Sequence, residues 1–321
     1  MKKIIIILSA ITAVLIFIGI IVYSILGKMN HVEIDKSDEV LGISIEPEPE
    51  NRENLDKSKS EVRNDIVNIV LFGLDNTNFN ENSRSDSIII LTADFINKKI
   101  KLSSLMRDMY VDIEGYGYTK LNHAYSYGGA PLAIKTINQY FGTNIRDYIA
   151  ANYIALEKII DIMGGVYIDL KQEEISEIKA CFSDVEITEA GKQLLNGNQA
   201  LAYSRIRYIG NGDFERTERQ RKVLFEIFVK ARDMGINSIP DLASEILPLV
   251  ETSMDKKTIL NLASDYFKSD EMDFDDERFP IDGYYWNDIT DGIYYLKFDA
   301  DFTKQQIIDY IFYDIKPKPK Q

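Results

Sequence analysis

Apolar and polar positions divide the chain into three parts with different patterns. Residues 4–26 are 23 consecutive positions without a charged side chain, and a helix of that length spans about 30 Å of hydrocarbon at about 1.5 Å per residue. Residues 28–63 are polar and acidic and show no apolar periodicity. From residue 64 onward, short apolar runs alternate with longer segments of helical periodicity. The pattern predicts one N-terminal transmembrane helix, a linker and a folded domain.

Charges on either side of the apolar segment predict its orientation. Lys2 and Lys3 precede it, whereas acidic residues dominate soon after Lys28, so the positive-inside rule places the N-terminus in the cytoplasm. A cleaved signal peptide is the competing interpretation, but its apolar stretch is usually about 7 to 15 residues and ends at a small-x-small site. We expect a single-pass protein of the cell membrane with an extracellular C-terminal domain. Its expected parts are a cytoplasmic tip and transmembrane helix (1–27), an extracellular acidic linker (28–63), a folded domain (64–316) and a tail (317–321).

Three short apolar runs open the domain and predict three strands. Residues 66–72 are β-branched and apolar and stop at a glycine, as expected of a buried strand. Residues 87–93 form a second such run, and residues 99–105 form a third with alternating polarity. The turn-forming pair at 97–98 separates the last two runs. Strands joined so tightly must be antiparallel.

The ends of these strands carry four charged residues. Asp75 follows the first strand, Arg84 and Asp86 precede or begin the second, and Arg107 follows the third. Because the hairpin turns near residue 97, Asp86 should lie roughly opposite Arg107, and a loop of about ten residues brings Asp75 to the same edge of the sheet. Solvated loop charges, the state of most aspartates and arginines, are the alternative. Spacing alone leaves both interpretations open.

Strands alternate with helices of about ten residues through the rest of the domain. This alternation predicts an α/β fold, an α/β/α sandwich around a mixed central β-sheet, which is mixed because of the early hairpin. Residues 120–129 are expected to be a loop, and residues 171–188 show no pattern. The expected helices cover residues 131–141, 155–163, 214–234, 239–247, 256–267 and 301–313, and the further strands cover residues 148–152, 166–170 and 292–298.

The long helix expected over residues 214–234 has two kinds of surface. Its apolar stripe consists of Leu224, Ile227, Phe228 and Ala231. By the three-and-four spacing, Arg216, Arg219 and Gln220 share one side of its first two turns. Two arginines near a helix N-terminus oppose the helix dipole, an arrangement that an anion in front of them would relieve. A solvated helix face is the alternative.

Two further arginines, Arg205 and Arg207, lie just before that helix in the sequence. Side chains two positions apart point the same way only in an extended chain. We therefore expect the short helix before them to end near Tyr203, which would let both guanidinium groups face one side.

Composition excludes several classes of function. The net charge is −14 and the pI is near 4.8, whereas a nucleic-acid-binding surface normally shows a basic stripe. The single cysteine, Cys181, cannot form an intrachain disulfide and is expected to be a small packed side chain. His123 is the only histidine in the expected domain, so a catalytic triad or a histidine-rich zinc site is hard to build.

Six sequence blocks, in a fixed order, contain the charged residues described above. They are Asn68–Asp75, Arg84–Ser87, Ser104–Asp108, Lys120–Tyr125, Leu201–Arg207, and Asp213–Arg216 with Arg219–Gln220. In this order and spacing the chain resembles the LytR-CpsA-Psr family, and the single span before the domain is also similar. Met106 stands where proline is commoner, and the loop between Asp75 and Asp86 is slightly short. Neither departure removes a charged group.

The resemblance implies a phosphotransferase outside the membrane of a Gram-positive-type cell. Such enzymes move an anionic glycopolymer from a polyprenyl (undecaprenyl) pyrophosphate carrier to peptidoglycan and form a phosphodiester link. The resemblance implies that Asp75 and Asp86 hold Mg²⁺, or Mn²⁺ in its place, with Asp86 as candidate proton acceptor. The implied pyrophosphate-binding residues are Arg84, Arg107, Arg205, Arg207, Arg216, Arg219 and Gln220, of which Arg107, Arg205 and Arg207 are also candidate catalytic residues. The implied partners are the lipid-linked glycopolymer, peptidoglycan and the cell membrane, with no nucleic acid.

Two alternatives keep parts of this interpretation. A polyprenyl-pyrophosphate pyrophosphatase or binding module would use the same charges without transfer to an acceptor. A membrane-bound transcriptional attenuator is a further alternative, which conflicts with the acidic charge and the predicted orientation.

Overall fold

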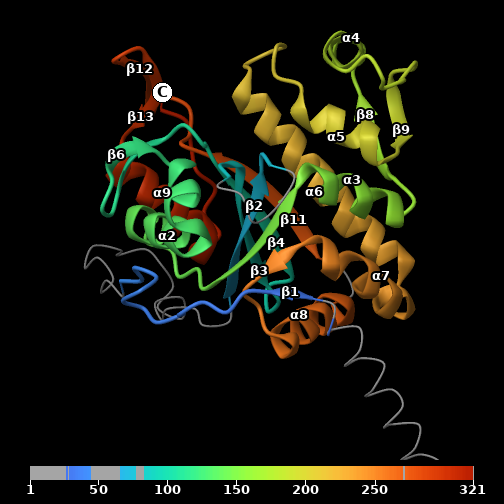
Figure 1. The fold of residues 1–321 in the computed structure, drawn as a ribbon, viewed down its shortest axis with the longest axis horizontal. Coiled ribbons are helices and arrows are strands. Elements are labelled where there is room, and N and C mark those ends of the chain that lie inside the picture. The colour runs from blue at the N-terminus through green and yellow to red at the C-terminus, as the bar shows by residue number, and fades with distance from the viewer. Residues whose placement is uncertain (1–26, 28, 45–65, 77–82, 270–271, 321) are drawn as a thin grey trace, which may run out of the picture.

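Seven strands form one mixed sheet at the centre of the molecule (Figure 1). The computed structural model describes residues 27, 29–44, 66–76, 83–269 and 272–320. In spatial order the strands are β1 (Asn30–His31), β10 (Glu251–Thr252), β7 (Asp147–Asn152), β2 (Ile66–Leu74), β3 (Ser85–Asp94), β4 (Lys99–Leu105) and β11 (Asp273–Phe279). β3 is antiparallel to β2 and β4, whereas β7 runs parallel to β2 and β11 runs parallel to β4. The predicted hairpin and mixed sheet are confirmed.

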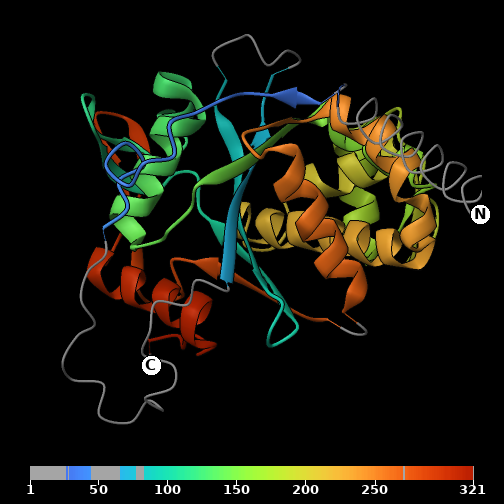
Figure 2. The same ribbon diagram turned by 90° about the horizontal axis from the view of Figure 1, so that it is seen from below.

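Helices cover both faces of this sheet (Figure 2). One face carries α2 (His123–Phe141) and α9 (Ala300–Tyr313). The opposite side carries α3 (Tyr153–Ile162), α6 (Asp213–Met234), α7 (Ile239–Ile246) and α8 (Lys256–Lys268), with α5 (Gly197–Arg205) packed on α3 and α6. Short 3-10 helices, η2 (Ile236–Ser238) and η3 (Leu247–Leu249), flank α7. The layers are those of the predicted α/β/α sandwich.

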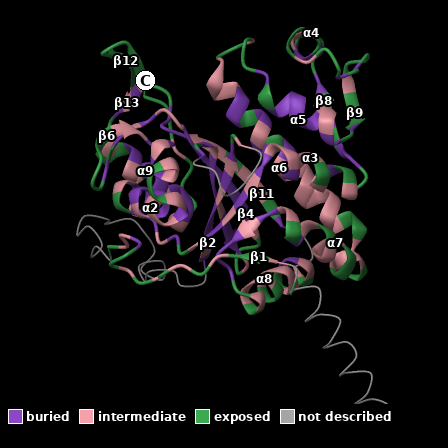
Figure 3. Cartoon of the chain, viewed as in Figure 1, coloured by how far each residue is buried: buried purple, intermediate pink, exposed green. Residues whose placement is uncertain are grey.

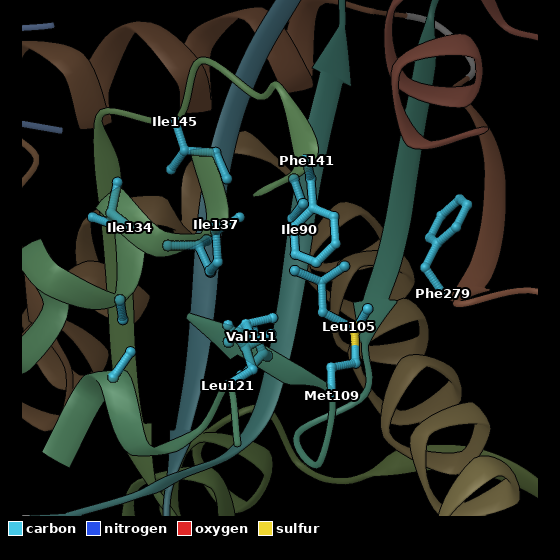
Figure 4. Close-up of a cluster of buried hydrophobic side chains, with 14 of the residues drawn as sticks. Ile90, Leu105, Met109, Val111, Leu121, Ile134, Ile137, Phe141, Ile145 and Phe279 are labelled. Atoms are coloured by element: carbon cyan, nitrogen blue, oxygen red, sulfur yellow. The ribbon is translucent and has the colours of Figure 1, made fainter. Parts of the chain in front are cut away.

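Strands β2 and β3 are apolar on both faces because both faces are covered. Val70, Phe72, Ile88 and Ile90 join the core under α2 and α9, and the alternate positions point toward α3 and α6. Figure 4 shows the first core, where Ile90 and Leu105 from the sheet lie near Phe141 of α2. Burial in Figure 3 is accordingly concentrated along the sheet and the inner sides of the helices.

Small hairpins extend from this framework. They are β5 (Tyr110–Ile113) with β6 (Gly117–Lys120), β8 (Val166–Leu170) with β9 (Gly191–Leu195), and β12 (Tyr285–Thr290) with β13 (Ile293–Phe298). The predicted strands at 166–170 and 292–298 exist, but they pair within these hairpins rather than in the central sheet.

Two segments expected to be irregular are helical. Residues 171–188 contain α4 (Gln172–Cys181), whose Ile175 and Ile178 are fully buried in a second core beneath β8. α2 begins at His123 instead of Pro131 and bends at residues 128–129, where both glycines leave helical geometry. Tertiary packing, which local periodicity does not contain, explains both differences.

The beginning of the predicted linker belongs to the folded domain. β1 pairs with β10, Leu41 is fully buried, and the Asn138 side-chain amide donates to the Leu41 carbonyl at 2.8 Å. Lys36 Nζ lies 2.6 Å from Asp147 Oδ1. Apolar residues are too sparse here to show periodicity, so the linker interpretation is wrong for residues 29–44. Residues 45–63 lie outside the described residues.

The predicted membrane span also lies outside the described residues, which exclude positions 1–26. Among the helices that the structure does describe, none is both long enough and apolar enough to cross a bilayer.

Candidate functional site

A charged edge begins where β2 ends and β3 starts. Asp75 follows β2, and its Oδ1 accepts hydrogen bonds from the Ser83 hydroxyl at 2.8 Å and the Arg84 backbone N–H at 3.0 Å. The two strands approach closely here, since a Cβ added to Gly73 would lie 2.8 Å from the Ser87 Cβ. Only glycine leaves room for this approach. The Asp75 carboxylate is thereby fixed at the edge of the sheet.

Asp86 and Arg107 meet at the same edge, as the hairpin geometry predicts. β3 and β4 pair with Ile89 opposite Ser104, and continuing that register outward places Asp86 opposite Arg107. Arg107 Nη1 lies 2.8 Å from Asp86 Oδ1. The predicted proximity of these two side chains is therefore confirmed.

Asp213, the first residue of α6, joins this pair to Arg216. Arg107 Nε lies 3.4 Å from Asp213 Oδ2, and Arg216 Nη2 lies 3.1 Å from Asp213 Oδ1. Arg216 Nη2 also donates to the Asp86 backbone carbonyl at 3.1 Å. Asp213 is not among the site residues expected from the sequence, although its spacing of three from Arg216 on a helix is a signal for such a pair.

Burial and charge act differently on the two arginines of this cluster. Burial alone would lower the pKa of Arg107, but the carboxylates of Asp213 and Asp86 outweigh it and raise that pKa. Burial lowers the pKa of Arg216 in spite of Asp213, and the positive charge of Arg107 adds to the effect. Arg216 is 6% exposed, and its Nε has no hydrogen-bond partner among the described residues. A buried donor of this kind is available to an anion.

Arg205 is the last residue of α5, and Arg207 follows it two positions later. α5 ends at Arg205 rather than near Tyr203. The Arg205 guanidinium lies 5.4 Å from the ring centroid of Phe182, and that of Arg207 lies 5.4 Å from the ring centroid of Tyr208. Within the described part of the chain, neither forms an ion pair with a carboxylate, so both guanidinium groups can bind an anion.

Of the two remaining arginines assigned to the site by resemblance, Arg219 takes another position, whereas Arg84 lies at the edge. Arg219 is 3% exposed, and its Nε lies 2.9 Å from Glu174 Oε1 while its Nη2 lies 3.0 Å from Glu215 Oε2. It joins α6 to α4, so the expectation that it faces the same side as Arg216 is wrong. Arg84 is exposed at the edge. Burial of the His123 ring lowers its pKa, and the positive charge of Arg84 lowers that pKa further.

A cavity of about 1090 Å³ leads from the charged edge into the space between the sheet and α3, α6 and α7. Its wall is mostly apolar, whereas its charged and amide residues lie together at the sheet edge. Those charged and amide residues are Asp75, Asp86, Asn152, Arg205, Arg207, Arg216 and Gln220. One side of α6 follows the cavity from Arg216 through Leu224 and Ile227 to Ala231, about 22 Å at 1.5 Å per residue. The predicted apolar stripe of α6 therefore lines a cavity.

Asp75 and Asp86 offer carboxylate oxygens, the ligand type that a hard divalent cation prefers, although Asp86 Oδ1 is paired with Arg107. Both carboxylates line the same cavity, and both hydrogen bonds to Asp75 use Oδ1. Within the described residues, no three His, Cys, Asp or Glu side chains form a cluster that could hold a metal. Mg²⁺ usually binds through one or two carboxylates and completes its shell with water and phosphate oxygens. The donor set suits this arrangement.

Known proteins share both the sequence pattern and the fold. A polyisoprenyl-teichoic acid–peptidoglycan teichoic acid transferase, TagU of Enterococcus faecalis, is 34% identical over 71% of this chain and 72% of its own length. The regulatory protein MsrR of Staphylococcus aureus is 32% identical over 78% of this chain and 76% of its own. A solved structure of YwtF (TagT) with bound octaprenyl pyrophosphate lipid has the same fold, with a TM-score of 0.64 and 23% identity over 88% of this chain and 99% of that one.

The family assignment follows from the extent of the match. The model of the LytR_cpsA_psr family matches residues 39–308. That range includes every residue of the charged edge and of the cavity wall. The chain therefore belongs to the LytR-CpsA-Psr family.

Proposed function

We propose that the chain transfers an anionic glycopolymer from a polyprenyl pyrophosphate carrier to peptidoglycan. The cavity is the observation that supports this most strongly, because its wall is apolar and its charges gather at one end. A polyprenyl pyrophosphate is divided in the same way, with a long hydrocarbon chain that ends in a compact anion. TagU carries this activity in its name, and the related TagT structure holds octaprenyl pyrophosphate.

The arginines at the mouth bind the diphosphate in this proposal. Arg205 and Arg207 lack carboxylate partners among the described residues, and Arg216 has an unpartnered Nε. Guanidinium groups offer paired donors that match phosphate oxygens. Arg107 is held by Asp86 and Asp213 and adds positive charge at the same edge. The hydrocarbon chain lies along the apolar side of α6.

Transfer then exchanges one phosphorus–oxygen bond for another. A peptidoglycan hydroxyl oxygen attacks the phosphorus that carries the glycopolymer, the bond to the polyprenyl phosphate breaks, and the hydroxyl proton passes to the Asp86 carboxylate. Phosphoryl transfer depends mainly on positioning and on stabilising charge at the oxygens, which the arginines supply. Asp75 and Asp86 would hold Mg²⁺, which when bound neutralises negative charge on phosphate oxygens.

The proposed site of action is the outer surface of the cell membrane. The support is the uncharged segment 4–26 with Lys2 and Lys3 before it, since such a segment spans a bilayer with its basic end inside. A reporter fused to the C-terminus tests this placement. Reporter activity in the cytoplasm would overturn it and favour the transcriptional attenuator.

The transfer itself is tested with the purified full-length protein and a lipid-linked glycopolymer, with and without peptidoglycan. The proposal predicts a phosphodiester-linked product, detected by mass analysis, and release of polyprenyl phosphate that depends on the acceptor. Equal release without peptidoglycan would identify a pyrophosphatase. Binding of the donor without any turnover would identify a binding module.

A further inference from the structure

A second hollow, of about 270 Å³, lies among the β5–β6 and β12–β13 hairpins. Its wall includes Tyr110, Tyr118, Tyr140, Trp286 and Lys297. In Figure 1 these hairpins lie on the α2 and α9 side of the sheet. The helices α3, α6 and α7, which line the larger cavity, lie on the other side. The hollow and the cavity therefore lie on opposite sides of the central sheet.

Two aromatic side chains in the wall of this hollow are more than half exposed to solvent. Trp286 is 53% exposed and Tyr118 is 61% exposed. The rings of Tyr110 and Tyr118 are 5.2 Å apart between centroids, those of Tyr110 and Tyr295 are 4.8 Å apart, and Lys297 Nζ lies 5.4 Å from the Tyr110 centroid. A group of exposed aromatic side chains can form a binding surface.

The hairpins that form the hollow also contact the segment that follows Arg107. Leu296 of β13 donates its backbone N–H to the Asp108 carbonyl at 2.8 Å, and Asp108 directly follows Arg107. Lys120 Nζ lies 2.7 Å from Asp108 Oδ1 and 5.7 Å from the ring centroid of Tyr294. A ligand on the hairpins therefore lies beside the segment that positions Arg107.

We propose that this hollow binds a sugar ring of the acceptor glycan strand, an inference that rests on the proposed function. In phosphoryl transfer the attacking and leaving oxygens lie roughly in line across the phosphorus. The leaving polyprenyl phosphate occupies the cavity side of the charged edge. The acceptor hydroxyl must then approach from the other side, where the hairpins stand.

The chemistry of the wall suits a saccharide. Tyrosine and tryptophan present flat apolar faces together with polar groups at their edges, and a sugar ring presents C–H faces and hydroxyl edges. Lys297 supplies a charged donor at the rim, where it also pairs with Asp288 at 2.9 Å. The volume is just below the range of about 300 to 1,000 Å³ typical of small-molecule pockets, which suits one ring of a longer strand.

Trp286 is the only tryptophan of the chain, so its fluorescence reports on the hollow directly. Titration of the full-length protein with soluble peptidoglycan glycan-strand fragments should change the emission in a saturable manner. Tyr118→Ala should weaken this response three- to tenfold, by loss of one aromatic contact, whereas Tyr118→Phe should retain it. A flat response to glycan fragments, or a response only to phospholipid vesicles, would overturn the proposal.

Kinetics separate this inference from the proposed function. Trp286→Ala and Tyr118→Ala should raise the KM for the acceptor three- to tenfold and leave the KM for the lipid-linked donor unchanged. The matched control is Tyr167→Ala, since Tyr167 is 47% exposed on β8 and also carries a lysine, Lys192, over its ring. A change in donor KM, or no difference from Tyr167→Ala, would refute the saccharide site. Absence of transfer by the wild type would refute the proposed function, while the fluorescence titration would still decide the glycan contact.

Discussion

Arg107→Ala should separate the catalytic contribution of the charged edge from its structural one. The side chain is 18% exposed and contacts Asp86 at 2.8 Å and Asp213 at 3.4 Å. Loss of one donor that stabilises transition-state charge usually costs about 10² to 10³ in turnover. Loss of the guanidinium also leaves two carboxylates without this partner. This should lower the free energy of unfolding by about 1 to 3 kcal/mol. For a domain of this size the Tm should fall by roughly 2 to 12 °C.

Both quantities are measured on the full-length protein, turnover with a lipid-linked donor and Tm by thermal unfolding. Arg146→Ala is the matched control, because Arg146 forms an ion pair with Asp38 in which both side chains are more than 40% exposed. Such surface pairs contribute about 0 to 1 kcal/mol, so turnover should stay within about twofold of wild type. Arg107→Ala protein that is folded at the assay temperature and turns over at a third of the wild-type rate would refute the role assigned to Arg107.

Three further variants test other parts of the structure. Ala231→Trp places a ring in the cavity about 22 Å from Arg216. The KM should therefore rise for long-chain donors and stay constant for donors whose lipid is too short to reach residue 231. Equal effects on both donors would contradict the assigned path of the lipid. Arg219→Ala leaves Glu174, which is 5% exposed, without its buried partner. The free energy of unfolding should fall by about 3 to 5 kcal/mol, while the folded protein keeps its affinity for diphosphate. A selective loss of that affinity would show that Arg219 binds the substrate. Burial and the charges of Arg84 and Lys120 lower the pKa of His123, so the histidine is protonated in the unfolded chain before the folded one as the pH falls below about 6.5. The Tm should therefore decrease from pH 7.5 to 5.5, and His123→Gln should make that decrease smaller. An unchanged pH dependence in the variant would show that other groups cause the decrease.

The parts of the site that sequence predicts are those that local geometry determines. The β3–β4 turn fixes the register, and the register brings Asp86 to Arg107. Helical spacing likewise predicts the apolar side of α6. In each case the relevant partners are related by a turn or by a helix period, which the sequence contains directly.

The parts that sequence does not predict depend on partners far away in the chain. Helical spacing places Arg219 near Arg216, but Glu174 of α4 attracts it to another side. Leu41 is buried against α2, but the short apolar group of Val40, Leu41 and Ile43 follows an acidic stretch and shows no helix or strand period. β11 is an edge strand that pairs with β4 yet consists mainly of charged residues, so it shows no strand pattern. Periodicity also shows that one side of α6 is apolar, but not that it lines a cavity.

The central claim is that one site binds both halves of a polyprenyl pyrophosphate, the hydrocarbon chain in the cavity and the diphosphate at the charged edge. Its most direct test is a binding titration of the full-length protein in lipid nanodiscs with polyprenyl pyrophosphate, inorganic pyrophosphate and polyprenol. The structure predicts that polyprenyl pyrophosphate binds far more tightly than either of the other two. Equal affinity for polyprenyl pyrophosphate and inorganic pyrophosphate, or for polyprenyl pyrophosphate and polyprenol, would contradict the claim.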